Sequence, residues 1–142
     1  MMVTMIPRAA LDDLWPVLWP LLERAARRAK PDAVAEADAR STVESGHAEL
    51  WAVFDGPQPV AAITTQLTTA PERRCRIWLV GGARMDEWAA DFMTMSERWA
   101  RDWGCKAIWG TQSRPGWAPI VALMGGEPID TANGVPAWER RL

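Results

Sequence analysis

The stretch RCRIWLVGGARMDEW, residues 74–88, decides the fold of this chain. Its first seven residues alternate, with Cys75, Ile77 and Leu79 on one face and the other four on the opposite face, which predicts a β-strand. Two glycines then turn the chain. Beyond them, apolar residues recur at helical spacing and predict one face of a helix: Trp88, Phe92, Met95, Trp99 and Trp103.

A glycine turn between a strand and a helix suits a phosphate group. The first backbone N–H groups of a helix have no partner within the helix, and the helix dipole is positive at that end. Residues 81–85 therefore predict either an anion site or a tight turn that binds nothing. The stretch alone leaves both interpretations open.

Bulk composition excludes several classes of protein. A chain of 142 residues with 49% hydrophobic residues is expected to form one domain with a substantial core. No apolar run reaches the roughly 18–20 residues that span a bilayer, and residues 1–6 lack the basic leader of a secretory signal. We therefore expect a cytoplasmic protein with no membrane partner.

Charge gives no support for a nucleic-acid partner, because the formal charge is −2 from 16 basic and 18 acidic residues. One local basic cluster is interpreted as the solvated end of a helix, and it consists of Arg24, Arg27, Arg28 and Lys30. Cys75 and Cys105 form no CxxC pair. We expect them to be small buried residues and expect no metal site.

Periodicity and turn signals predict the order of elements. A strand at residues 3–6 precedes a helix from residue 11 to about residue 30, which we expect to kink or restart at Pro16 and Pro20. A helix at 32–43 leads to strands at 49–54, 60–69 and 74–80, expected as an antiparallel meander. The remaining expected elements are a helix at 86–103 capped by Gly104, a strand at 106–109, a helix from 114 to about 126, and a closing hairpin of 127–130 with 135–141 around Asn133-Gly134.

This order resembles the GNAT N-acetyltransferase superfamily across nearly the whole chain. The resemblance implies an α/β (α+β) fold in a single domain, residues 1–142: a mixed, mostly antiparallel central sheet of about six to seven strands flanked by about four helices. It also implies acetyl-CoA as cosubstrate. The family's pyrophosphate loop, roughly Gln/Arg-x-x-Gly-x-Gly/Ala, aligns its last three positions with Gly81, Gly82 and Ala83, whereas its Gln/Arg position falls on Trp78.

A narrower resemblance rests on four segments of the chain, namely residues 49–56, 60–65, 99–105 and 113–117. These segments are similar to small GNAT-like proteins of tailed bacteriophages, whose Gly-Arg-x-Gly-Trp box has Ser113 in place of its first glycine here. The similarity implies residence in the host cytoplasm or in the virion. It also implies that the partners are other virion proteins or further copies of the chain.

The GNAT resemblance implies a cofactor site along one stretch: Trp78, Leu79, Val80, Gly81, Gly82, Ala83, Arg84 and Met85. Backbone N–H groups of residues 82–85 would hold the pyrophosphate, with Arg84 adding charge. The pantetheine arm would lie between the strands 76–80 and 106–109. Backbone N–H groups of the first strand would face the thioester carbonyl as negative charge develops on its oxygen.

Catalytic groups are harder to assign, because relatives often use a tyrosine as the acid and this chain has none. Ser113 and the ring N–H of Trp117 are the nearby alternatives. Glu49 is the candidate base, although a solvated charge at the end of a strand is the simpler interpretation of this residue. His47 lies beside it, and its simpler interpretation is a residue of a surface loop. Where many relatives carry a catalytic glutamate, this chain has Arg76 or Trp78.

Two functions follow from the resemblance. One is transfer of acetyl from acetyl-CoA to an amine of a small molecule or protein. The alternative is a catalytically degenerate GNAT-like domain that serves as a virion or protein-interaction component. If the turn holds pyrophosphate, Gly82→Asp is expected to abolish CoA binding and leave the fold intact.

Overall fold

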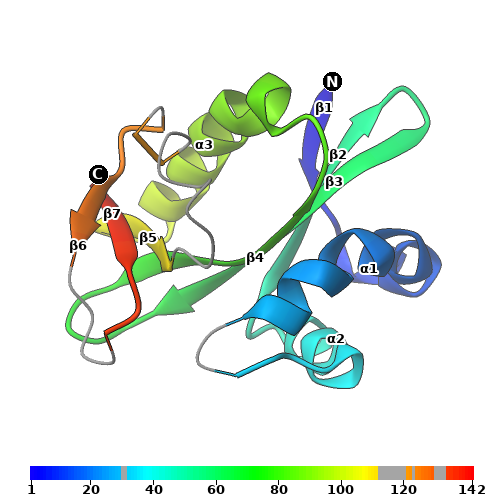
Figure 1. Ribbon diagram of the computed structural model, residues 1–142, viewed down its shortest axis with the longest axis horizontal. Coiled ribbons are helices and arrows are strands. Elements are labelled where there is room, and N and C mark those ends of the chain that lie inside the picture. The colour runs from blue at the N-terminus through cyan, green and yellow to red at the C-terminus, as the bar shows by residue number, and fades with distance from the viewer. Residues whose placement is uncertain (30–31, 112–120, 123, 130–133) are drawn as a thin grey trace.

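The computed structural model describes residues 1–29, 32–111, 121–122, 124–129 and 134–142. Within these residues the chain forms one seven-stranded sheet in the order β1-β2-β3-β4-β5-β7-β6 (Figure 1). Only β4 and β5 pair in parallel, and every other neighbouring pair is antiparallel. The expected mixed, mostly antiparallel sheet is confirmed.

The sheet contains β1 (Met2–Met5), β2 (Glu49–Asp55), β3 (Gln58–Thr68), β4 (Arg74–Gly82), β5 (Ala107–Thr111), β6 (Glu127–Ile129) and β7 (Ala137–Arg141). The α-helices of the described residues are α1 (Leu11–Arg28), α2 (Glu36–Glu44) and α3 (Met85–Asp102). A 3₁₀ turn, Arg8–Ala10, precedes α1. About four helices were expected, but most of the one expected from residue 114 lies outside the described residues. None of the described helices is long and apolar enough to cross a membrane.

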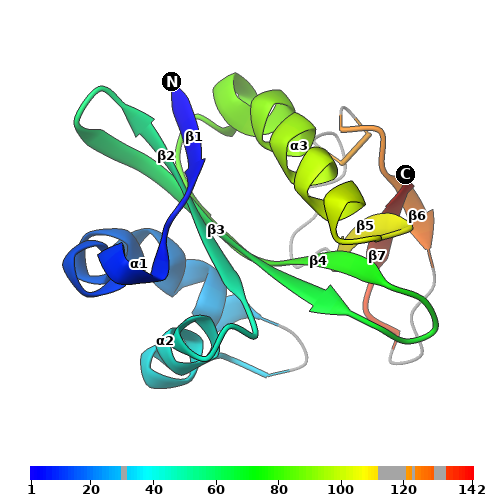
Figure 2. The same ribbon diagram turned by 180° about the vertical axis from the view of Figure 1, so that it is seen from behind.

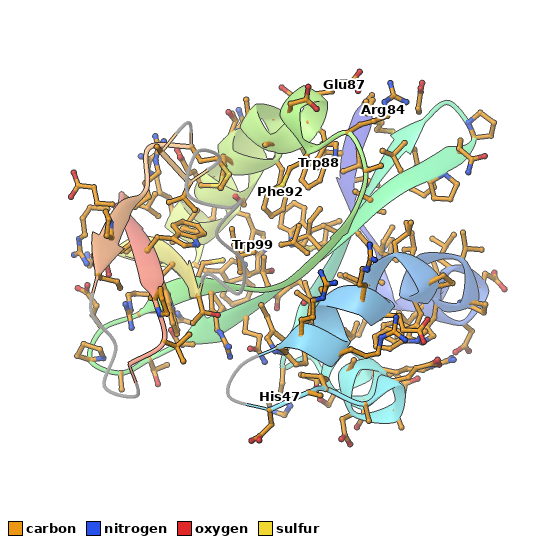
Figure 3. All side chains as sticks on the ribbon, in the orientation of Figure 1. His47, Arg84, Glu87, Trp88, Phe92 and Trp99 are labelled. Atoms are coloured by element: carbon orange, nitrogen blue, oxygen red, sulfur yellow. The ribbon has the colours of Figure 1, made fainter. Side chains whose placement is uncertain are left out.

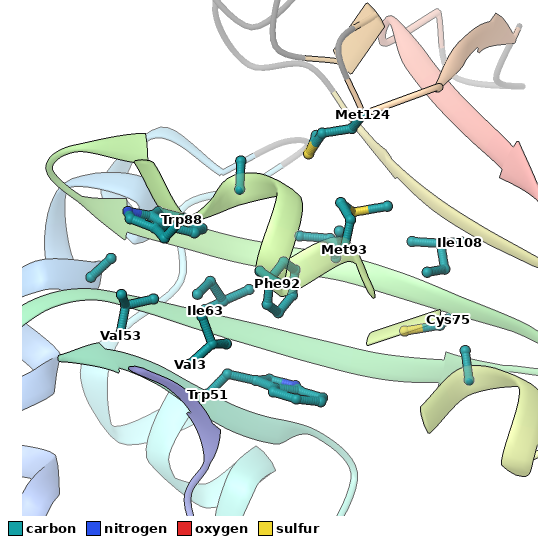
Figure 4. Packing of buried hydrophobic residues seen from close by; sticks show 14 of the residues in the cluster. Val3, Trp51, Val53, Ile63, Cys75, Trp88, Phe92, Met93, Ile108 and Met124 are labelled. Atoms are coloured by element: carbon teal, nitrogen blue, oxygen red, sulfur yellow. The ribbon is translucent and has the colours of Figure 1, made fainter. Parts of the chain in front are cut away.

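Helices cover both faces of the sheet, with α3 on one and α1 and α2 on the other (Figures 1 and 2). On the α3 face, the Trp51 ring meets the Phe92 ring edge-on at 5.5 Å between centroids (Figure 4). Cys75 also lies in this core, and both it and Cys105 are buried free thiols, as expected. The second core, under α1 and α2, is built around Trp15, Leu18, Leu22, Leu50 and Leu79.

The first two helices differ from expectation in one respect each. The helix α1 runs without a restart through Pro16 and Pro20, because both prolines lie on its exposed side, where water can bond to the carbonyl groups they leave without partners. The helix α2 begins at Glu36 and not at residue 32. The Val34 N–H donates to the Ala26 carbonyl at 2.8 Å, which holds this segment against the end of α1.

The buried face of α3 is rotated from the one expected. Trp88 and Phe92 are buried, but Met95 and Trp103 are 37% and 51% exposed, so their expected place on the core face is wrong. Small residues take the core positions instead, namely Ala89, Ser96 and Ala100. They share the buried face with the large side chains of Trp88, Phe92 and Met93.

A β-bulge in β4 divides that strand in two. Thr64 pairs with Leu79 and Thr65 with Ile77, so Trp78 is an extra residue on β4. Before the bulge, Cys75 and Ile77 pack in the α3 core, whereas Leu79 packs in the α1 core. The expected common face for Cys75, Ile77 and Leu79 is therefore wrong at Leu79, because an extra residue shifts the alternation by one.

Candidate active site

The strands β4 and β5 separate halfway along β4. They are paired only where Cys75, Arg76 and Ile77 face Ile108, Trp109 and Gly110. Beyond the bulge at Trp78, no strand of the described residues pairs with this edge of β4. We call the space beside this unpaired edge of β4 the fork.

The register with β3 shows which backbone groups face the fork. The Ala83 N–H donates to the Val60 carbonyl at 3.0 Å, and hydrogen-bonding residues alternate in an antiparallel ladder. Gly81 therefore turns its backbone groups toward β3, while Val80 and Gly82 turn theirs toward the fork. Two N–H groups on the open edge of β4 are thus directed at whatever occupies the fork.

A pocket of about 270 Å³ lies between α1, the end of β4 and the start of α3. It is smaller than the roughly 300–1,000 Å³ of sites that enclose a whole small molecule, so it suits one part of a larger ligand. Its lining consists of Pro20, Leu21, Arg24, Ala25, Val80, Gly81, Gly82, Met85 and Trp88. The Trp88 ring is fixed by a hydrogen bond of 2.9 Å from Nε1 to the Ala83 carbonyl.

Two features of this pocket suit an anion. The helix α3 begins at Met85, and no side chain of the described residues caps it, which leaves the N–H groups of Met85 and Asp86 available to a ligand. Arg24 is exposed at the pocket and makes no hydrogen bond or ion pair with any part of the chain that the structure describes. A helix N-terminus with a nearby guanidinium is an arrangement that binds phosphate. Sequence reasoning missed Arg24, which it assigned to the solvated end of a helix.

Arg84 is engaged by carboxylates of its own chain. Its guanidinium donates to both carboxylate oxygens of Glu87, at 2.7 and 3.0 Å, and to Asp55 Oδ2 at 2.8 Å. These bonds hold the pKa values of Asp55 and Glu87 below their ordinary range. Figure 3 shows Arg84 and Glu87 together at the start of α3. A phosphate that used Arg84 as expected would have to displace these carboxylates.

Gly81 and Gly82 both have structural reasons to be glycine. A Cβ atom on Gly81 would lie 1.8 Å from the Leu21 carbonyl oxygen, because α1 crosses β4 at this point. Gly82 has a φ of +122°, and a Cβ there would lie 2.4 Å from the Val60 carbonyl oxygen. Gly82→Asp would therefore disturb the fold, contrary to the expectation from the sequence, and it cannot test binding alone.

Glu49, the candidate base, is half-buried at the start of β2. The Trp51 Nε1–H donates to Thr65 Oγ1, which in turn donates to Glu49 Oε1, both at 3.0 Å. Burial raises the pKa of Glu49 despite the hydrogen bond from Thr65 and the charge of Arg8. Because β3 lies between β2 and β4, sheet spacing puts this carboxylate about 10 Å from β4, so a base role requires intervening water.

The other candidate groups lie elsewhere. His47 is exposed, its Nδ1 lies 2.8 Å from Ser45 Oγ, and it stands far from Arg84 in Figure 3. Its interpretation as a surface residue is confirmed. Ser113 and Trp117 lie outside the described residues.

No protein-family model and no curated protein sequence matches this chain. Among the solved structures, a polyamine N-acetyltransferase of Drosophila melanogaster matches at TM-score 0.74 and 12% identity, over 99% of this chain and 99% of that one. A mosquito arylalkylamine N-acetyltransferase-like protein 5b matches at TM-score 0.74 and 10% identity, with the same coverage of both chains. An aminoglycoside 6'-N-acetyltransferase complexed with coenzyme A matches at TM-score 0.69 and 14% identity, over 99% of this chain and 97% of that one. A GNAT domain from S. lividans matches at TM-score 0.71 and 13% identity, over 99% of this chain and 89% of that one. Likeness at such identities concerns architecture, and by architecture this chain has the fold of the GNAT N-acetyltransferases.

Proposed function

We propose that this chain binds acetyl-CoA and transfers its acetyl group to an amine of a small molecule or protein. One observation carries the proposal: β4 leaves β5 at the Trp78 bulge and leads directly into a pocket formed by an uncapped helix N-terminus and Arg24. An elongated ligand with a phosphate at one end and a reactive carbonyl at the other fits that arrangement.

In this proposal the pyrophosphate lies in the pocket, against the N–H groups of Met85 and Asp86 and the guanidinium of Arg24. The pantetheine arm follows the open edge of β4, where Val80 and Gly82 present their N–H groups. The proposed cofactor site therefore keeps residues 78–85 and adds Arg24 on α1.

The transfer itself is simple acyl chemistry. The amine nitrogen attacks the thioester carbonyl carbon, a C–N bond forms, and the C–S bond breaks with its electron pair on the CoA sulfur. Backbone N–H groups on the open edge of β4 would stabilise the oxyanion. The amine loses a proton and the thiolate gains one; we assign Glu49, through water, as base and Ser113 as acid.

Replacing Arg24 with glutamine is expected to weaken acetyl-CoA binding about tenfold or more, because a hydrogen bond to a charged group contributes about 1.5–3 kcal/mol. Titration calorimetry measures this affinity. Arg27→Gln is the matched control, since Arg27 is exposed on the same helix and does not line the pocket. If both variants bind like the wild type, Arg24 is not a ligand of the phosphate.

Glu49→Gln is expected to lower turnover while the affinity for acetyl-CoA stays unchanged. Burial raises the pKa of the folded carboxyl, so its ionisation costs stability as pH rises through that pKa. The glutamine variant should therefore be more stable than the wild type at pH 7, and the difference should vanish below about pH 4, where the carboxyl is protonated in both states. An unaltered rate would exclude the base role, and lower stability at pH 7 would contradict the direction of the pKa shift.

The degenerate domain is the second proposal, and the contacts of Arg84 with Glu87 and Asp55 favour it, because they remove one positive charge from the phosphate site. The absence of tyrosine points the same way. On this proposal the chain acts in a phage particle or as a protein-interaction module. Failure of the wild-type protein to bind acetyl-CoA at millimolar concentration would reject the transferase and leave this function.

A further inference from the structure

Arg76 stands just before the fork, on the face of the sheet opposite α3. It pairs in register with Trp109, one position before the last β4–β5 pair. Its neighbours Cys75 and Ile77 pack in the α3 core, so Arg76 points to the face that carries α1 and α2. The core under these helices extends to Trp78 on β4, two residues beyond Arg76.

The guanidinium of Arg76 is half-buried and has no counter-charge among the described residues. Its Nη1 donates to Gln66 Oε1 at a long 3.4 Å, and its buried Nε has no hydrogen-bond partner in the part of the chain that the structure describes. The guanidinium lies 5.5 Å from the centroid of the Trp109 ring, which is itself held by a bond from Nε1 to Thr68 Oγ1. No carboxylate of the described residues contacts it. A partly buried cation with unused donors is a site for an anion.

Arg74 provides a comparison within the same strand. Its guanidinium lies over the same Trp109 ring, at 4.6 Å, and its Nε also lacks a partner. Arg74, however, forms an ion pair of 3.1 Å with Glu139, in which both side chains are mostly buried. Among the described residues, Arg74 thus has an anionic partner and Arg76 has none, which leaves the guanidinium of Arg76 open to an anionic ligand.

We propose that Arg76 binds a carboxylate of the acyl acceptor, so that the acceptor is an amine carrying a distant carboxylate, such as the side-chain amine of free lysine. This inference rests on the proposed acetyl transfer. The acetyl group would lie against β4 beyond Trp78, and two residues of strand place Arg76 about 7 Å back along β4, a span that the side chain of lysine covers. A polyamine would bring a positive charge to Arg76, which disfavours it.

A matched pair of acceptors tests this proposal directly: lysine and cadaverine, which differ only by a carboxylate. The wild type is expected to prefer the carboxylated member by about tenfold or more in kcat/KM. Arg76→Gln should remove the preference and Arg76→Lys should retain part of it, while Arg98→Gln, at an exposed position of α3, should leave it unchanged. Equal rates for both members in the wild type would overturn the inference and leave the transferase standing.

A binding measurement separates this inference from catalysis. In ¹⁵N-labelled protein, the Nε–H signal of Arg76 is identified by its absence from Arg76→Gln. Nε-acetyl-lysine should shift that signal, whereas N-acetylcadaverine should not. No shift with either ligand at millimolar concentration would overturn the carboxylate site, whatever the fate of acetyl transfer.

Discussion

Gly81→Ala is expected to destabilise the protein and, at the same time, to weaken acetyl-CoA binding. The added Cβ would lie 1.8 Å from the Leu21 carbonyl oxygen and 2.8 Å from its carbon, both backbone atoms that no rotamer change can move aside. The helix α1 must then shift away from β4, at the upper end of the about 1–3 kcal/mol that overpacking costs, or beyond it. Because α1 also forms one wall of the pocket, the shift should displace Arg24 from the phosphate site. Denaturant unfolding and titration calorimetry measure the two effects.

Gly104→Ala is the matched control for this variant. Gly104 has a φ of +76° with open space around it, so alanine there would destabilise the fold only through its left-handed backbone conformation, by about 1–2 kcal/mol. It also lies at the far end of α3 from the pocket, and acetyl-CoA binding should not change. A Gly81→Ala variant no less stable than Gly104→Ala would mean that α1 does not press on β4.

Phe92→Ala is expected to lower the free energy of unfolding by about 3–5 kcal/mol, the largest loss of stability among the variants considered. Phe92 is 2% exposed and lies in the α3 core between the Trp51 and Trp88 rings, at centroid distances of 5.5 and 6.3 Å (Figure 4). Alanine leaves a cavity among rigid rings that cannot collapse to fill it. Urea unfolding followed by circular dichroism gives the value.

Met95→Ala supplies the comparison on the same helix. Met95 is 37% exposed, so its replacement should change stability by no more than about 0.5 kcal/mol. Comparable losses for the two variants would mean that the buried face of α3 is the one that spacing alone predicts, with Met95 on it.

Local patterns predicted most of the strands and helices. Alternation, helical spacing and turn residues are properties of a few neighbouring residues, which is why the β2-β3-β4 meander, α3 and the closing hairpin follow from them. The bulge at Trp78 does not, because the alternating pattern of residues 74–80 continues through it and no glycine or proline marks it. It depends on Thr64, whose Oγ1 accepts the Leu79 N–H at 2.9 Å, a residue of another strand.

The sequence predicted the candidate site only in part. The glycine turn and the helix start after it are adjacent in sequence, so the pocket proposed here for the phosphate could be placed there. Arg24 reaches the same pocket only through the packing of α1 on β4, although its spacing from Pro20 and Leu21, which also line the pocket, puts all three on one side of α1. The contact between Arg84 and Asp55 likewise joins residues 29 positions apart, which no local pattern reveals.

The close crossing of α1 over Gly81 and the left-handed backbone of Gly82 also bear on how such chains diverge. Selection for folding alone would keep both glycines even in a descendant that did not bind the proposed cofactor. The presence of both glycines in a sequence therefore indicates the fold and says nothing about activity. Arg24 has no side-chain partner among the described residues, and Arg76 contacts only Gln66 and the Trp109 ring, so loss of the proposed chemistry would appear first as drift at these two positions.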